Sequence, residues 1–89
     1  MKFVALLHII DAEKNKELRP AHLKYIAELY RQGLVVHAGP FTDGKGGMVV
    51  YETKDHAHAQ QLAEADPVVA GKARTLELRE WNALDLDTL

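Results

Sequence analysis

The sequence predicts an α+β fold whose strands and helices follow the order βαββαβ. The first observation behind this prediction is an apolar run at residues 3–10, broken only by His8, which suits a strand and is too short to span a membrane. The second is a pair of amphipathic helical segments, each bounded by apolar stretches of strand length. At 89 residues, the chain is expected to form one domain over residues 1–89.

Both faces of the first strand are apolar. Its residues alternate between one set formed by Phe3, Ala5, Leu7 and Ile9 and another formed by Val4, Leu6 and Ile10. A strand that is apolar on both faces has to be covered on both faces. Because two helices of a small domain cover only one face of its sheet, the other face needs a second subunit or a ligand pocket. The sequence therefore predicts a dimer.

Prolines, glycines and acidic caps mark the limits of the remaining elements. Pro20 is expected to open the first helix and Gly33 to end it, while Asp55 caps the second helix. The expected ranges are 20–32 for the first helix, 34–41 and 48–53 for a hairpin, 67–71 for a short helix and 73–81 for the last strand. This order is the split βαβ pattern of ferredoxin-like folds.

Composition excludes several classes of function. The formal net charge is −2 with acidic and basic residues interspersed, which argues against a nucleic-acid partner. The absence of cysteine excludes disulfides, thiolate catalysis and zinc–thiolate sites. The first apolar run has no small-residue cleavage site after it, so it reads as a strand and not as a leader. We expect a soluble, cytoplasmic protein without a membrane partner.

Three blocks of sequence carry a resemblance to a known family. They are Arg19–Leu23 (RPAHL), Gly33–Pro40 (GLVVHAGP) and Ala65–Pro67 (ADP), in that order. With these blocks, the chain resembles the YciI-like (YCII-related) family of small proteins that form dimeric α/β barrels. The resemblance implies that two ferredoxin-like sheets pack face to face. It also implies that the histidine and the aspartate of the first and last blocks form a pair.

His22 and Asp66 are the candidate catalytic residues. His22 is expected in the first turn of its helix, where the positive end of the helix dipole favours the neutral imidazole that a general base requires. If the two are adjacent, Asp66 fixes the tautomer of that ring, and Arg19 can hold an anionic group nearby. The alternatives are a half-buried histidine without a catalytic role and an aspartate that only caps a helix.

Other polar residues are candidates for substrate binding. His8 is either a hydrogen-bonded core histidine or a group that binds a substrate oxygen, and His37 has a similar but weaker case. Gly39 and Pro40 either shape the rim of a pocket or form a plain turn. No pair of histidines has the spacing of helical metal ligands, so no metal site is expected.

The resemblance implies chemistry without a cofactor. Relatives of this kind include chlorinated hydroxyhydroquinone dehydrochlorinases, and their fold is similar to that of muconolactone isomerases. The implied function is a homodimeric or larger lyase or isomerase that moves protons on a small aromatic substrate, most concretely by removing chloride from a chlorinated hydroxyhydroquinone. Two alternatives stay open: a ligand-binding or regulatory dimer without activity, and a haem-linked oxygenase of the same barrel group with an axial histidine.

Overall fold

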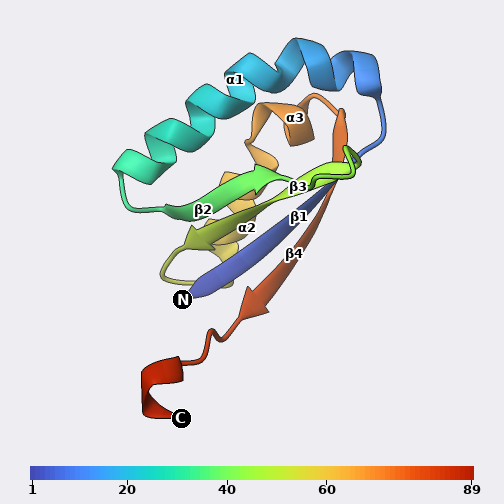
Figure 1. Cartoon of the computed structure of the whole chain (residues 1–89). Coiled ribbons are helices and arrows are strands. Elements are labelled where there is room, and N and C mark those ends of the chain that lie inside the picture. The colour runs from blue at the N-terminus through green and yellow to red at the C-terminus, as the bar shows by residue number, and fades with distance from the viewer.

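A four-stranded antiparallel sheet carries the helices in the computed structural model, which describes residues 1–89 (Figure 1). The strands are β1 (Lys2–Ile9), β2 (Val35–Pro40), β3 (Gly46–Glu52) and β4 (Arg74–Trp81), in the spatial order β2-β3-β1-β4. The helices are α1 (Ala12–Arg31), α2 (His56–Glu64), α3 (Pro67–Ala70) and the short 3₁₀ helix η1 (Leu86–Thr88). The predicted α+β, ferredoxin-like arrangement is confirmed.

The core lies between the helices and one face of the sheet. On β1, Phe3, Ala5 and Leu7 are buried, whereas Val4 and Leu6 are only half-buried. The buried set forms one cluster with residues of all three helices, such as Leu29 of α1, Ala59 and Ala63 of α2, and Val68 of α3. We call the second surface of the sheet, which points away from this cluster, the open face. Of the two apolar faces of β1, the chain itself therefore covers only the one that points toward the helices.

The first helix begins at Ala12 and not at Pro20, so the predicted start was wrong. Asp11 caps α1, since its carboxylate accepts the backbone N–H of Lys14 at 3.0 Å. Pro20 lies inside the helix on an exposed face, where the carbonyl of Lys16 that lacks its usual N–H partner can meet water. Strong helix formers before Pro20, together with the aspartate cap, overrode the proline signal.

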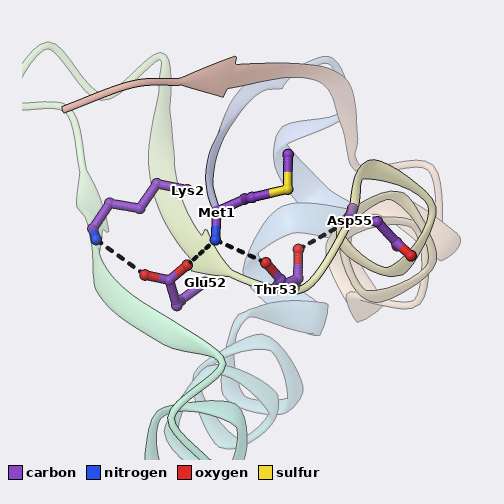
Figure 2. A network of polar contacts seen from close by, with 5 residues as sticks. All are labelled: Met1, Lys2, Glu52, Thr53 and Asp55. Atoms are coloured by element: carbon purple, nitrogen blue, oxygen red, sulfur yellow. Dashed lines mark hydrogen bonds and ion pairs between the residues drawn. The ribbon is translucent and has the colours of Figure 1, made fainter.

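The start of β1 and the end of β3 are joined by a small polar network (Figure 2). The terminal amine of Met1 donates to the Glu52 carboxylate and to the carbonyl oxygen of Thr53, and Lys2 Nζ donates to Glu52 at 3.0 Å. Hydrogen bonds from these two cations lower the pKa of Glu52. The Thr53 hydroxyl donates to the carbonyl oxygen of Asp55, which caps α2 as predicted. The network holds the short connection between the end of β3 and the start of α2 in place.

The chain beyond β4 projects away from the sheet (Figure 1). Leu84, Leu86 and Leu89 are exposed there. None of the helices combines the length and the apolar character that a membrane crossing demands.

Candidate functional site: a buried histidine–aspartate pair

His22 and Asp66 meet beneath α1. Nδ1 of His22 lies 2.8 Å from each carboxylate oxygen of Asp66, although the two residues are 44 positions apart in sequence. The exposed fraction is 7% for His22 and 0% for Asp66. The juxtaposition that the sequence only suggested is therefore present, in an environment that largely excludes water.

Two features of local structure bring the pair together. Asp66 caps α3, and its Oδ1 accepts the N–H of Val68 at 3.2 Å, as the Asp-Pro signal predicted. Gly71 ends α3 against α1: a Cβ there would lie 2.4 Å from Cδ1 of Leu18 and 2.8 Å from the carbonyl oxygen of Pro67. The glycine thus permits the close approach that presents Asp66 to the middle of α1.

The contact also decides which nitrogen of His22 is available. A carboxylate only accepts hydrogen bonds, so Nδ1 carries the hydrogen and donates it to Asp66. Nε2 has no hydrogen-bond partner within the chain, yet no fully buried side-chain nitrogen is left unpartnered. Nε2 therefore keeps access to open space. The helix-dipole argument made for His22 from the sequence was wrong, since His22 lies in the middle of α1 and the dipole acts only near the helix ends.

A small cavity of about 180 Å³ lies beside this ring, between α1 and the sheet. Its apolar lining includes Leu7, Leu23, Ile26 and Val49. Gly39 and Pro40 at the end of β2 also line it. The cavity is below the roughly 300 Å³ at which pockets for drug-sized ligands begin, so it suits a small molecule.

Two arginines complete the lining of the cavity. Arg19 comes from α1, one turn before His22, and Arg74 is the first residue of β4. Arg74 is 7% exposed, and its Nε donates to the side-chain oxygen of Asn15 at 2.7 Å. Burial lowers the pKa of Arg74, and Arg19 adds to this, while Asp66 opposes it. The guanidinium nevertheless stays charged at neutral pH.

The charge of Asp66 influences two tyrosines as well. Burial is the main cause that raises the pKa of Tyr25 and of Tyr51, and the Asp66 carboxylate raises both further. The Tyr25 hydroxyl donates to the backbone carbonyl of Leu62 at 2.7 Å, which ties α1 to α2. Both phenols stay protonated at neutral pH, so they frame the pair without adding charge to it.

His8 and His37 lie apart from this site. His8 pairs in register with Gly46 and Thr75 on the open face, on the opposite side of the sheet from His22. Both histidines are exposed in the single chain, so His8 is not part of the core beneath the helices. The structure therefore does not bring His8 to the cavity that Arg19 and His22 line. No group of three or more potential metal ligands gathers anywhere in the chain.

The sequence reading missed Arg74 and Asn15. The sequence could have indicated Arg74, because it alternates along β4 with Leu76 and Leu78 and so points to the same face of the sheet, the one that the helices cover. A charged residue in phase with buried ones requires a partner or a function.

The fold and site together define a ferredoxin-like α+β protein with a histidine–aspartate pair facing a small cavity. The family model described as the YCII-related domain matches residues 1–82. The chain belongs to this family, as its sequence motifs suggested. The "Uncharacterized protein YjpA" of Bacillus subtilis (strain 168) is 31% identical over 80 residues, which cover 89% of this chain and 94% of that protein.

A solved structure shares the fold. It is that of 5-chloro-2-hydroxyhydroquinone dehydrochlorinase (TftG) from Burkholderia phenoliruptrix AC1100 in complex with 2,5-dihydroxybenzoquinone. The match has a TM-score of 0.80 and covers 94% of this chain and 96% of that one, with 17% sequence identity. At this identity the likeness establishes the fold.

Proposed function

We propose that this chain is an enzyme of cofactor-free proton transfer in which His22, oriented by Asp66, acts as general base and general acid. The observation that carries the proposal is the hydrogen bond from Nδ1 of His22 to the buried Asp66 carboxylate, beside a cavity that His22 lines. A histidine held in one tautomer, with its second nitrogen free, is equipped to take a proton and return it.

The surroundings of the pair support this role. Asp66 is fully buried and its carboxylate is occupied by His22 and by the N–H of Val68, so it orients the ring and leaves proton exchange with a ligand to Nε2. Apolar side chains form a large part of the cavity wall beside the ring. The available volume admits a single ring with small substituents.

We propose removal of chloride from a chlorinated hydroxyhydroquinone as the specific reaction. His22 takes a proton from a ring hydroxyl and returns one to the ring carbon that carries chlorine. Chloride then leaves with the electron pair of the C–Cl bond, while a second hydroxyl gives up its proton. The products are a hydroxybenzoquinone and one equivalent of HCl, so no external oxidant is needed. The named activity and the bound quinone of the structural relative support this choice of substrate.

Chloride release tests the proposal directly. We expect wild-type protein to release chloride from 5-chloro-2-hydroxyhydroquinone under anaerobic, reducing conditions, which suppress spontaneous oxidation of the substrate. The variant His22→Asn keeps a donor for the buried carboxylate but has no base, so the rate should fall by about 10²–10⁴-fold. His37→Asn is the matched control, since this histidine is exposed on the open face.

Either of two results would contradict the proposal. One is release by wild type that does not exceed the rate without protein. The other is a His22→Asn variant that stays folded and keeps the wild-type rate. A folded, inactive wild type that binds the substrate would instead indicate a ligand-binding module.

A homodimer, or a larger assembly of dimers, is also our expectation for the working form. The open face presents half-buried Val4, Leu6 and Met48 to the surroundings, and a second copy of the same face can cover them.

A further inference from the structure

We propose that Arg74 binds an anionic oxygen of the ligand, so that the cavity beside His22 is selective for small planar anions over neutral molecules of the same shape. This role deepens the proposed function and rests on it, because it assumes that the cavity of His22 is where the ligand binds.

The state of the Arg74 guanidinium is the first observation. The residue is 7% exposed, but Nε is its only nitrogen with a protein acceptor, the side-chain oxygen of Asn15. The two Nη groups donate to nothing within the chain. Since no fully buried side-chain nitrogen lacks a partner, these groups reach open space, and Arg74 lines the cavity. A mostly buried cation thus offers its free donors to whatever occupies the cavity.

The charges nearby leave that cation uncompensated. Arg74 has no carboxylate within ion-pair distance, since none of the chain's ion pairs includes it. Asp66 is near enough to favour the charged form of Arg74, but its oxygens are engaged by His22 and by Val68. Arg19 lines the same cavity and adds a second positive charge. An anion between the two arginines would relieve their repulsion and the desolvation of Arg74.

Asn15 holds the guanidinium in place. Its side-chain oxygen accepts from Nε at 2.7 Å, which leaves the outer edge with both Nη groups for a ligand. This edge matches the planar pair of oxygens in a carboxylate, or a phenolate with its neighbouring hydroxyl. The apolar walls formed by Leu7, Ile26 and Val49 suit the flat ring that would carry such a group.

Benzoate and benzamide are suitable probes, because they share one shape and differ in charge. We expect benzoate to bind wild-type protein at least about tenfold more tightly than benzamide in NMR titrations, with the largest shifts at residues lining the cavity. Arg74→Met should weaken benzoate by about tenfold or more and leave benzamide unchanged. Arg31→Met is the matched control, since it makes the same change at the exposed end of α1, away from the cavity.

Two further variants separate binding from folding. Arg74→Lys keeps the charge but not the fork of donors, and should bind benzoate with intermediate affinity. Asn15→Ala should weaken benzoate less than Arg74→Met does, because it frees the guanidinium without removing it. If Arg74→Met does not fold, these two variants and the comparison of benzoate with benzamide in wild type decide the matter.

The outcomes also separate this proposal from the proposed function. Equal affinity for benzoate and benzamide, no binding of either, or benzoate binding that Arg74→Lys and Arg74→Met leave unchanged would overturn the role of Arg74. Selective, Arg74-dependent binding in a protein that releases no chloride would uphold it while the proposed reaction fails. Chloride release by a protein that binds benzoate and benzamide equally would support the proposed reaction and overturn the role of Arg74.

Discussion

The histidines on the two sides of the sheet differ in burial and in hydrogen bonding. Beneath the helices, His22 is buried, donates to a buried carboxylate and lines a cavity. On the open face, His8 and His37 are exposed and have no hydrogen-bond partner within the chain. All three were candidates in the sequence, where each stands among apolar neighbours. The difference shows that the partner and the burial, and not the neighbours in sequence, give a histidine its chemical role.

The largest effect should come from Asp66→Asn. An amide can still accept the N–H of Val68, so α3 keeps its cap, but its NH₂ group would donate to Nδ1 and impose the wrong tautomer on His22. We expect chloride release to fall by about 10³–10⁴-fold. The free energy of unfolding, measured with urea, should change far less than the activity does. A folded Asp66→Asn variant with the wild-type rate would show that the two faces do not differ in the way proposed.

A change on the open face should alter assembly. Leu6 lies near the centre of this face, in register with Met48 and Glu77. If a second copy covers the face, sedimentation should give a dimer for wild type and a monomer for Leu6→Lys, because a lysine there buries an unpaired charge. Leu84→Lys in the exposed tail is the control. A monomeric wild type, or a dimer that Leu6→Lys leaves intact, would contradict this use of the open face.

The smallest effect concerns Glu52, at the edge of the open face. Its pKa is lower in the folded state than its usual value, because the amine of Met1 and Lys2 donate to it. The stabilisation is therefore present above the usual pKa and is lost as the pH falls through the lower folded value. Glu52→Gln should flatten the decline of the free energy of unfolding between about pH 5 and pH 3. If the free energy of unfolding falls equally with pH in wild type and in Glu52→Gln, Glu52 does not contribute to the acid sensitivity of the fold.

The order of elements could be predicted because local signals agree with the fold. The two apolar faces of β1, the aspartate at position 55 and the Asp66-Pro67 opening each act through a few neighbouring residues. The start of α1 could not be predicted as easily, since two local signals compete there. Asp11 and Pro20 can each begin a helix, and the strong helix formers between them decide in favour of Asp11.

The site was only partly predictable for a related reason. The sequence motifs single out His22 and Asp66, but their contact spans 44 positions and depends on how α3 packs on α1. Arg74 enters the cavity through the register of β4 on β1, and its partner Asn15 comes from a segment expected to precede the helix. Whether His8 faces the cavity of His22 could not be predicted, because alternation along β1 assigns it to a face without revealing which face the helices cover.

A double-mutant cycle of chloride release tests most directly whether His22 and Asp66 act as one catalytic unit. Rates are compared for wild type, His22→Asn, Asp66→Asn and the variant with both changes. If the two residues act as one unit, the double variant should be no slower than the slower single variant. Losses that multiply, in variants that remain folded, would mean that each residue contributes independently and that the buried pair is not the catalytic unit.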